Sequence, residues 1–521
     1  MDYNKMAVAE LRILAKEKGL VDVEKMKKKD LAELLTAVDM KLSKPAAPRT
    51  ADQAQRVSKS AQPTPAPTEA KKTSVSKTSR KTTSVETKKD VQETETKQST
   101  QSQQNNQPQQ NNQPQQNNQA QQAAQPQQEN GNLQYDGQEY NPELASGTYA
   151  YGLLEVMNDG YGFIRSDNYM PGDKDIYISP TQIRRFRLRT GDIIRGPIRK
   201  KLQPTEKFSG LLYIESVNGM FPSKLASRVA FEDMTPIFPD ERIHLDYTGA
   251  PKSLRIVDLF SPIGKGQRGM IVSPPKAGKT TLLKQIAKRI SVAYPEMNLI
   301  ILLIDERPEE VTDIKEAIEG PNAEVIYSTF DQTPEHHKRV SEMVIERAKR
   351  LVESHKDVVI LIDSITRLAR AYNLTVTASG RTLSGGLDPA ALHMPKKFFG
   401  AARNMREGGS LTILATALID TGSRMDDVVF EEFKGTGNME LVLSRNLSEK
   451  RVFPAIDIDK SGTRRDDLLL DPDERMILDR IHSELRGLKS EEVTESIIRL
   501  FDKTRNNKEF IAMAEKILNR N

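Results

Sequence analysis

Ser273–Thr281 reads SPPKAGKTT and decides the fold of this chain. The stretch follows the apolar run Gly269–Val272 and opens a segment that is compatible with a helix. This order predicts a strand, a phosphate-binding loop and the N-terminus of a helix, where backbone N–H groups attract anions. A surface turn before a helix is the alternative interpretation, because Ser273 replaces the first glycine of the pattern G-x-x-x-x-G-K-[ST].

The loop carries the residue types that nucleoside triphosphate chemistry requires. Ala277 and Gly278 are small enough for backbone N–H groups to close on phosphate. Lys279 supplies an ammonium for the β- and γ-phosphates, and Thr280 supplies a hydroxyl for Mg²⁺. The loop therefore predicts that the chain hydrolyses a nucleoside triphosphate.

Two further apolar runs end in carboxylates. Leu299–Ile304 (LIILLI) is followed by Asp305 and Glu306, and Val358–Ile362 (VVILI) is followed by Asp363. Open α/β sheets bind their ligands at the carboxyl ends of such buried strands. These runs favour the nucleotide interpretation over the surface turn.

The composition sets the broad class of protein. A chain of 521 residues has room for about two to four domains, and it contains no Cys, which excludes disulfides and Cys-ligated zinc. Its apolar runs are shorter than the roughly 18 residues of a membrane span, and it begins with no signal segment. We therefore expect a cytoplasmic protein. The formal net charge of +5 favours a polyanionic partner only mildly.

The first 146 residues divide into two segments. Residues 1–44 carry apolar residues at helical spacing within Met6–Met40 and predict a small helical bundle. Residues 45–146 are rich in Lys, Ser, Thr and Pro and then in Gln and Asn, with QQNNQP blocks at Gln103–Gln119. Such a segment cannot bury enough apolar surface to fold, so we expect a disordered tether. Its Asn and Gln content also permits self-association.

The remaining residues predict two folded domains. In residues 147–222, turns separate short apolar runs, which predicts a small barrel of about five strands. In residues 223–521, apolar runs alternate with amphipathic stretches such as Pro334–Ser354 and Lys396–Glu407, which predicts a mainly parallel sheet covered by helices. Charged helices are expected from Asp473 onward. The predicted strands are Tyr149–Val156, Gly162–Arg165, Asp175–Ser179, Asp192–Arg199, Gly210–Val217, Met270–Val272, Leu299–Ile304, Val325–Tyr327, Val358–Ile362 and Leu411–Thr416.

The predicted barrel contains aromatic side chains that are suited to stacking on RNA bases. Tyr161 and Phe163 are two residues apart and therefore share one face of a strand. Exposed rings on such barrels stack on bases, and the basic segment Arg184–Arg189 could guide the RNA backbone. Core packing of the two rings is the alternative. The RNA-binding residues predicted in the barrel are Gly160, Tyr161, Gly162, Phe163, Ile164, Arg165, Asp175, Ile176, Tyr177, Glu206, Lys207 and Phe208.

Several long motifs resemble those of the Rho family of bacterial transcription termination factors, which are hexameric ATP-driven RNA translocases. The resemblance covers roughly Gly147 to the C-terminus and, less specifically, Met6–Met40. The serine at position 273 is tolerated in that family. The motifs are PIGKGQRG (Pro262–Gly269), PPKAGKT (Pro274–Thr280), LLIDERPEEVT (Leu302–Thr312), LIDSITRLARAYN (Leu361–Asn373), EEFKGTGNMEL (Glu431–Leu441) and EKRVFPAIDIDKSGTRR (Glu449–Arg465).

The resemblance implies a fold, partners and an activity. It implies a five-stranded OB-fold barrel of the cold-shock type, followed by a RecA-like P-loop ATPase domain. The implied activity is that of an RNA-dependent ATPase and 5'-to-3' RNA helicase that binds nascent single-stranded RNA and displaces RNA polymerase. ATP and Mg²⁺ are the implied cofactors. The implied partners also include the elongation factor NusG and further copies of the chain in a homohexameric ring.

The resemblance further implies catalytic roles. Glu306 would polarise the attacking water, and Asp363 would hold Mg²⁺ together with Thr280. Arg464 would reach the nucleotide held by Lys279 of a neighbouring subunit. Read without the motif, such an arginine is more often a surface ion pair. The nucleotide-binding residues implied in full are Gly264, Lys265, Gly266, Gln267, Arg268, Gly269, Lys276, Ala277, Gly278, Lys279, Thr280, Thr281, Arg307 and Phe453.

Two loops would hold RNA in the channel of such a ring. The first loop is Arg381–Gly386 and the second is Asp420–Arg424. Without the resemblance, both are ordinary loops with turn residues. The residues of the first loop are Arg381, Thr382, Leu383, Ser384, Gly385 and Gly386.

His336 and His337 are adjacent on an expected helix, so we expect their rings to point apart and to form no metal site.

Two other functions compete with an RNA-dependent ATPase. A rotary or transport ATPase would use the same fold, but it would have no use for a barrel face that stacks on bases. A non-enzymatic RNA-binding assembly protein would have a nucleotide pocket that has lost at least one catalytic residue. The joint presence of Lys279, Thr280, Glu306 and Asp363 disfavours this alternative. Fold alone does not decide between these functions.

Overall fold

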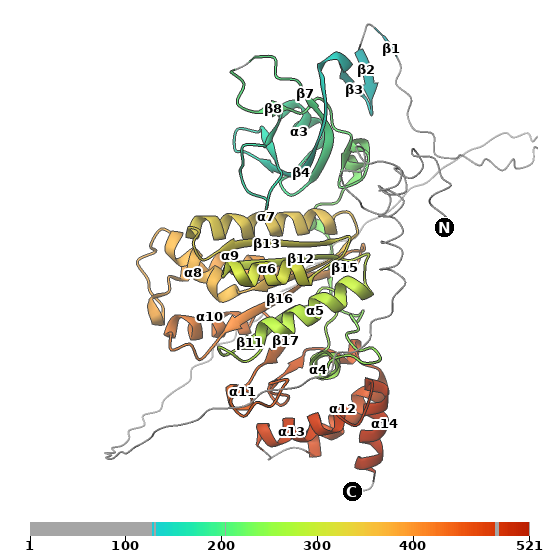
Figure 1. Cartoon of the computed structure of the whole chain (residues 1–521), viewed down its shortest axis with the longest axis vertical. Coiled ribbons are helices and arrows are strands. Elements are labelled where there is room, and N and C mark those ends of the chain that lie inside the picture. Colours follow the sequence, from blue (N-terminus) through green and yellow to red (C-terminus); the bar gives the residue numbers. More distant parts are fainter. Residues whose placement is uncertain (1–127, 130–131, 204, 485–488, 520–521) are drawn as a thin grey trace, which may run out of the picture. The chain divides into compact units, whose positions relative to one another are not determined.

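The computed structural model describes residues 128–129, 132–203, 205–484 and 489–519. The predicted helical bundle within residues 1–44 and the QQNNQP blocks lie outside these residues. The described part of the chain contains a small β-domain, a large α/β domain and a group of C-terminal helices (Figure 1). Within these ranges, no helix combines the length and the apolar character that a membrane crossing requires.

The α/β domain is built on a largely parallel sheet, as the apolar runs predicted. All five predicted runs of this domain are strands, and the order across the sheet is β13-β12-β14-β16-β11-β17-β18. Only the pairing of β18 with β17 is antiparallel along this path. The short strands β10 and β15 add antiparallel pairs beside β16. The bounds are β10 Pro236–Ile237, β11 Arg268–Ser273, β12 Asn298–Glu306, β13 Ala323–Thr329, β14 Asp357–Asp363, β15 Arg403–Met405, β16 Ser410–Leu418, β17 Met439–Val442 and β18 Gly462–Thr463.

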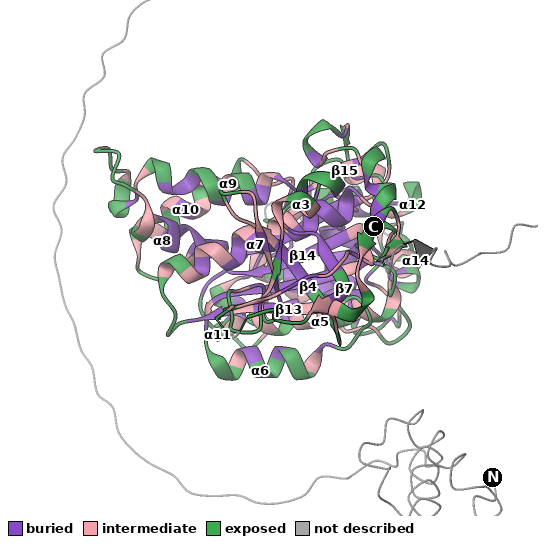
Figure 2. Cartoon of the chain, turned by 90° about the horizontal axis from the view of Figure 1, so that it is seen from above, coloured by how far each residue is buried: buried purple, intermediate pink, exposed green. Residues whose placement is uncertain are grey.

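Helices cover both faces of this sheet, which explains why its strands read as continuous apolar runs. On β12, Leu299 and Ile301 belong to the core beneath α4, α5 and α6. Ile300 and Leu302 belong to the core beneath α7, α8, α9 and α10. Figure 2 shows buried β14 surrounded by helices with exposed outer faces. The bounds are α4 Lys252–Phe260, α5 Lys279–Ala293, α6 Pro308–Ala317, α7 Pro334–Val352, α8 Ile365–Thr375, α9 His393–Gly400, α10 Arg424–Lys434 and α11 Arg445–Glu449.

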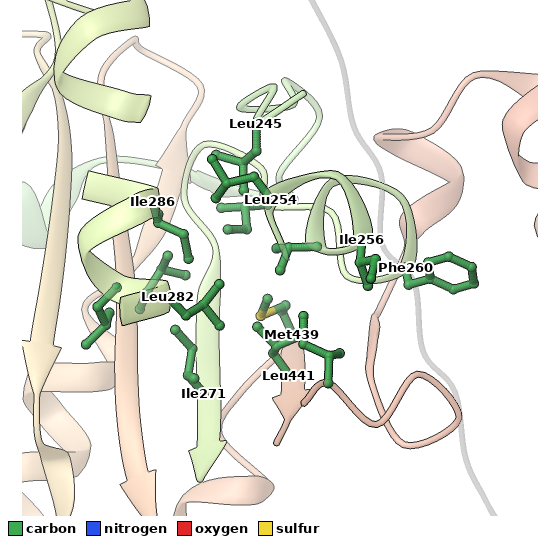
Figure 3. Close-up of a cluster of buried hydrophobic side chains, with 14 of the residues drawn as sticks. Leu245, Leu254, Ile256, Phe260, Ile271, Leu282, Ile286, Met439 and Leu441 are labelled. Atoms are coloured by element: carbon green, nitrogen blue, oxygen red, sulfur yellow. The ribbon is translucent and has the colours of Figure 1, made fainter. Parts of the chain in front are cut away.

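The first of these cores ties the phosphate-loop helix to the sheet. Figure 3 shows Leu282 and Ile286 of α5 beside Ile271 of β11, with side chains of α4 and β17 in the same cluster. Ile286 and Ile271 are fully buried. Truncating such a side chain to Ala typically costs about 2–5 kcal/mol, so α5 is held firmly in place.

The stretch Lys396–Glu407, predicted as one amphipathic segment, is divided in the structure. Helix α9 ends at Gly400, and strand β15 follows from Arg403. Because Arg403 and Asn404 pair with Leu411 and Ser410 of β16, the chain gains sheet hydrogen bonds that a longer helix would forgo. The predicted helix was therefore too long.

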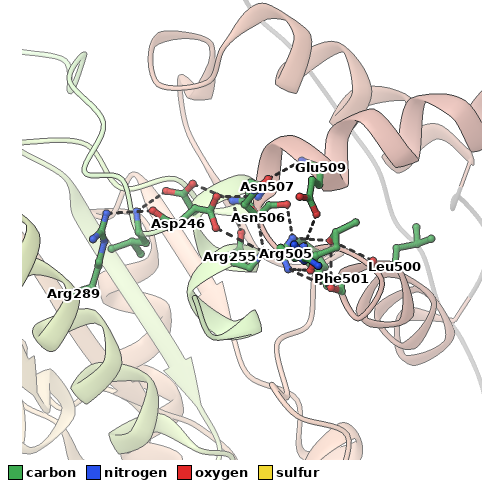
Figure 4. A network of polar contacts seen from close by, with 12 residues as sticks. Asp246, Arg255, Arg289, Leu500, Phe501, Arg505, Asn506, Asn507 and Glu509 are labelled. Atoms are coloured by element: carbon green, nitrogen blue, oxygen red, sulfur yellow. Dashed lines mark hydrogen bonds and ion pairs between the residues drawn. The ribbon is translucent and has the colours of Figure 1, made fainter. Parts of the chain in front are cut away.

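The C-terminal helices α12 (Pro472–Glu484), α13 (Ser490–Phe501) and α14 (Asn507–Leu518) are anchored to α4 by a buried arginine. Arg255 is 2% exposed and donates hydrogen bonds to the carbonyl oxygens of Thr504 (2.7 Å) and Asn506 (2.6 Å) (Figure 4). Asn507 donates in turn to Asp258 of α4 at 3.1 Å. Because a buried guanidinium requires such partners, this network fixes the C-terminal helices on the α/β domain.

The β-domain is a sheet with the order β8-β6-β5-β4-β7-β9. A bridge joins Ile198 of β7 to Leu211, directly after β8, so the β8 end of the sheet meets β7, and a core that includes Leu154, Ile164 and Ile178 fills the interior. The predicted strands are present, although Gly210–Val217 contains two short strands instead of one. The bounds are β4 Ala145–Val156, β5 Gly162–Arg165, β6 Ile176–Ile178, β7 Ile193–Arg199, β8 Ser209–Gly210 and β9 Ser216–Val217.

The basic segment Arg184–Arg189 begins within a helix, α3 (Pro180–Phe186), whose start carries a capping box between Ser179 and Gln182. One element of this domain corrects a sequence-based expectation. Residues 132–146, expected to be disordered, include the hairpin of β2 (Asn132–Tyr135) and β3 (Gln138–Tyr140) and the start of β4. The hairpin could not be predicted from composition, because it is stabilised by contacts with residues about 75 positions later in the chain.

Candidate nucleotide site and RNA-binding face

The phosphate loop has the predicted arrangement of strand, loop and helix. Strand β11 ends at Ser273, and α5 begins at Lys279. Gly278 precedes the helix with φ 94° and ψ 17°, a conformation that glycine adopts without strain. No side chain caps this helix N-terminus. Its first backbone N–H groups are therefore available to phosphate oxygens.

The structure brings two of the predicted catalytic residues, Glu306 and Asp363, to this loop. Glu306 ends β12 and Asp363 ends the neighbouring strand β14, and both side chains are almost fully buried. The Lys279 ammonium forms an ion pair with Asp363. The Thr416 hydroxyl donates to the same carboxylate at 2.9 Å and orients it. Sequence reasoning did not select Thr416, since one threonine within an apolar run gives no distinctive signal.

The environment of Glu306 changes its proton affinity. Burial, together with the negative charge of Asp363, raises the pKa of Glu306 above its ordinary value. The Arg367 guanidinium, whose Nη1 lies 3.2 Å from Glu306 Oε2, acts in the opposite direction and lowers it. A carboxyl group with a raised pKa is a stronger base once it is ionised, which suits proton abstraction from water.

A pocket of about 300 Å³ adjoins the loop on the side of α4. Its walls include Gly278 of the loop and the half-exposed ring of Phe453. The predicted residues Ala277 and Thr281 also line the pocket. Lys276 is exposed in the loop, and Thr280 is partly buried in the first turn of α5. The pocket residues that sequence reasoning missed are Lys252, Ser253, Leu282, Gln285, Leu443, Pro454, Ala455 and Ile456.

Gly264–Gly269 lie at the far end of β11 from the phosphate loop of the same chain. Arg268 begins β11 and Ser273 ends it, so the two ends are about 17 Å apart at the usual rise per residue. Gln267 is fully buried and donates to Asn438 at 2.8 Å, and Lys265 pairs with Glu241 and Asp357. These side chains are occupied by structural contacts.

Arg464 is placed at this same far end. It follows β18, whose Thr463 is level with Met439 of β17 and hence with Gly269 of β11. The backbone N–H of Arg464 donates to the carbonyl oxygen of Asn438 at 2.8 Å, and the N–H of Asn438 donates to that of Arg268 at 2.9 Å, so Arg464 lies near that end of the strand. The exposed Arg464 therefore lies away from Lys279 of its own chain. Arg307, also exposed, directly follows Glu306 and precedes α6.

Four aromatic rings gather on the β-domain, and we call them the ring cluster: Tyr161, Phe163, Tyr177 and Phe208. The ring centroid of Tyr161 lies 5.7 Å from that of Phe163 and 5.8 Å from that of Tyr177, and Phe208 lies 5.0 Å from Phe163. None of the four belongs to the buried core of this domain, and Tyr177 is 36% exposed. The alternative that Tyr161 and Phe163 fill the core is therefore wrong.

Charged residues of the predicted RNA face are paired with one another. Arg165 is 5% exposed, forms ion pairs with Asp175 and Glu155, and lies 4.9 Å from the centroid of the Phe163 ring. Glu206 pairs with Arg199 at 3.3 Å, whereas Lys207 is exposed. The other predicted RNA-binding residues of this face carry no aromatic ring. They lie on β5, on β6 or in the turn before β5, and they are Gly160, Gly162, Ile164 and Ile176.

The two predicted channel loops lie together in the structure. Gly385, in the loop Arg381–Gly386, has φ 78°, and a Cβ atom added there would lie 2.5 Å from the backbone nitrogen of Met425. Arg424, the last residue of the second loop, begins α10, and both Arg381 and Arg424 are exposed. Two segments far apart in the sequence therefore adjoin, and each carries an exposed arginine.

The expectation that His336 and His337 point apart is wrong. The Nδ1 atoms of both rings approach the Ser328 hydroxyl oxygen, at 2.7 Å and 2.6 Å. The chain turns directly from β13 into α7, so this buried hydroxyl lies beneath the first turn of the helix, where both rings reach it.

Comparisons with known proteins match both domains. The family model described as "Rho termination factor, RNA-binding domain" matches residues 150–223, and that of the "ATP synthase alpha/beta family, nucleotide-binding domain" matches residues 253–463. The transcription termination factor Rho of Bacillus subtilis is 56% identical over 372 residues, which are 71% of this chain and 86% of that relative. The Rho factor of Thermotoga maritima is 54% identical over 370 residues, again 71% of this chain and 86% of the relative.

Proposed function

The chain belongs to the Rho family of transcription termination factors, and we propose that it translocates along single-stranded RNA by hydrolysing ATP, unwinds RNA in the 5'-to-3' direction and displaces RNA polymerase. It is an ATP-dependent, RNA-binding termination factor; the direction, the helicase activity and the contact with polymerase are the proposal. The observation that supports it best is the convergence of Lys279, Glu306 and Asp363 in a chain that also carries the ring cluster.

The residues of the nucleotide site have different proposed roles in ATP hydrolysis. The backbone of the phosphate loop and Lys279 hold the phosphates of ATP. Glu306 accepts a proton from the attacking water. Thr280 and Asp363 fit a magnesium site, since Mg²⁺ is commonly held by one or two protein oxygens plus substrate phosphates. Bound Mg²⁺ would neutralise charge on the phosphates.

We also propose that the working form is a homohexamer with ATP sites between subunits. Arg464 is exposed and remote from its own phosphate loop, so a neighbouring chain is the natural place for it to act. Gly264–Gly269 share that end of β11 and would face the same neighbour. The paired loops with Arg381 and Arg424 are proposed to hold RNA in the ring, with NusG as a further partner.

ATP turnover with and without a cytosine-rich RNA tests this function. RNA should stimulate turnover severalfold, and the same protein should displace a strand from an RNA duplex only when ATP is present. Turnover without any response to RNA would favour an ATPase that drives a shaft or a transported substrate. RNA binding without turnover would indicate a pocket that has lost its catalytic function.

The pH dependence of turnover should reveal Glu306. The pKa of Glu306 is raised above the ordinary glutamate value of about 4.3. Because only the ionised carboxylate can accept a proton, kcat should fall as the pH drops through this raised pKa. Arg367→Ala removes the charge that lowers this pKa and should move the acidic limb to higher pH. Arg367→Lys, which keeps the charge, should move it less. An acidic limb at the same pH in all three proteins would contradict the role of Glu306.

The ring cluster should account for much of the RNA affinity. Tyr161→Ala and Phe163→Ala should each weaken binding by roughly 1–3 kcal/mol, the usual value of one base–aromatic stack. Tyr151→Ala removes a ring that is 69% exposed on β4 but outside the cluster, and should leave the affinity unchanged. A filter-binding titration measures all three. Equal affinities in folded proteins would exclude the cluster as the RNA-binding face.

A further inference from the structure

A pocket of about 430 Å³ opens on the β-domain beside the ring cluster, and we call it the side pocket. Its walls come from the hairpin β2–β3, from α3, from β6 and β7, and from the segment that begins in β8. The side chains that matter here are Glu139, Tyr177, Gln182, Arg185 and Arg199. The volume lies within the roughly 300–1,000 Å³ typical of ligand sites.

We propose that the side pocket binds one further nucleotide of the RNA strand whose bases stack on the ring cluster. This inference rests on the proposed RNA-binding function of that face and extends it to residues that precede the matched RNA-binding domain, which begins at residue 150. The ligand is therefore a nucleotide within a continuous single strand.

Tyr177 connects the two sites. Its ring belongs to the ring cluster, 5.8 Å from Tyr161 and 6.1 Å from Phe163 between centroids, and it also lines the side pocket. A strand that stacks on the cluster and continues past Tyr177 reaches the mouth of the pocket. Stacking platforms with adjacent basic grooves are the usual arrangement for single-stranded RNA.

The polar groups of the side pocket suit a nucleotide better than a bare phosphate. Arg185 is exposed and uses Nη2 for the carbonyl oxygen of Gly137, which leaves other guanidinium N–H groups for a phosphate. Arg199 is partly neutralised by Glu206. The Glu139 carboxylate would repel phosphate but can accept a hydrogen bond from a base amino group. Phosphate is therefore expected beside Arg185, and the base beside Glu139.

The hairpin wall is held rigidly enough to shape such a site. Gln138 is 5% exposed; its Nε2 donates to the carbonyl oxygen of Ile214 at 2.8 Å, and its Oε1 accepts from the Ile214 N–H at 2.8 Å. The rings of Tyr135 and Tyr140 pack 5.0 Å and 4.2 Å from that of Tyr213. The hairpin is thus a fixed part of the domain.

Two variants of the full-length protein test the inference with labelled cytidine oligomers in a fluorescence anisotropy titration. Arg185→Ala should weaken binding of a six-nucleotide oligomer by roughly threefold to tenfold and leave binding of a dinucleotide unchanged. The slope of log affinity against log salt should become shallower by about 0.7, the value for one lost phosphate contact on a single strand. Arg195→Ala, a matched change on β7 outside the pocket where the guanidinium pairs with Glu215, should alter neither quantity.

Arg185→Ala also removes the hydrogen bond from Arg185 to Gly137 of the hairpin. Thr181→Glu is therefore a second variant that keeps this hydrogen bond. It places a negative charge at the pocket while favouring the N-terminus of α3, so the fold is retained and the longer oligomer alone should bind more weakly. If both pocket variants affect the two lengths equally, or affect neither, the side pocket does not bind the strand. Phe163→Ala separates the two ideas, because it should weaken both lengths. An unchanged affinity there would reject the proposed RNA face itself.

Discussion

Lys279→Ala should lower the kcat for ATP by at least about 10²–10³, the usual cost of losing one electrostatic contact to the transferring group. The reason is geometric: Lys279 begins α5 at the phosphate loop, and its ammonium already lies against Asp363 at the edge of the sheet. RNA binding by the ring cluster should persist, because those rings belong to another domain. Steady-state ATP turnover and filter binding on the same preparation measure both quantities.

The matched control is Lys284→Ala, which removes a lysine one turn further along α5 where it pairs with the exposed Asp313. It should retain turnover. Because Lys279→Ala leaves the buried Asp363 without its cation, a thermal melt must show that the variant is folded, and Lys279→Arg restores the charge. Turnover by a folded Lys279→Ala protein close to that of the unmodified chain would reject this ATP site.

Arg464→Ala should reduce turnover by about 10³–10⁵, as for other arginines that stabilise a transferring phosphoryl group. Since Arg464 lies at the end of β11 opposite its own phosphate loop, it is expected to act on the nucleotide of the next subunit. Mixing Arg464→Ala chains with Lys279→Ala chains then creates some interfaces that carry both intact groups. Partial turnover should return when these two inactive proteins are assembled together.

Arg465→Ala is the matched control, because this neighbouring arginine is exposed and pairs with Asp467 of its own chain. It should remain active. If exchange of subunits is demonstrated and no mixture recovers activity, unmodified chains diluted with each variant distinguish the causes. A steep loss indicates a ring that requires every site, whereas a proportional loss indicates that Arg464 acts within its own chain.

Much of the nucleotide site could be predicted because its signals are local. The strands of the parallel sheet are buried on both faces, so they appear in the sequence as continuous apolar runs. Glu306 and Asp363 each follow such a run, and parallel pairing of neighbouring strands brings their ends to one edge. The pocket residues of α4 could not be predicted in this way, since Ser253 precedes the loop by 20 positions without any motif.

The fold separates some residues that are neighbours in the sequence. Gly264–Gly269 adjoin the phosphate loop along the chain, yet β11 runs between them and carries them to opposite ends of the sheet. The reverse holds for the hairpin at 132–140. It follows a Gln/Asn-rich tract, but distant partners such as Ile214 and Tyr213 stabilise its order.

Residue spacing within single elements was enough to predict the strand, loop and helix around Lys279, the parallel sheet and the pairing of rings at Tyr161 and Phe163. Tertiary structure alone decided that Arg165 is enclosed by two carboxylates, that the loops with Arg381 and Arg424 adjoin, and that Arg464 faces away from its own loop. These features depend on which distant segments pack together. Local spacing carries no information about such contacts.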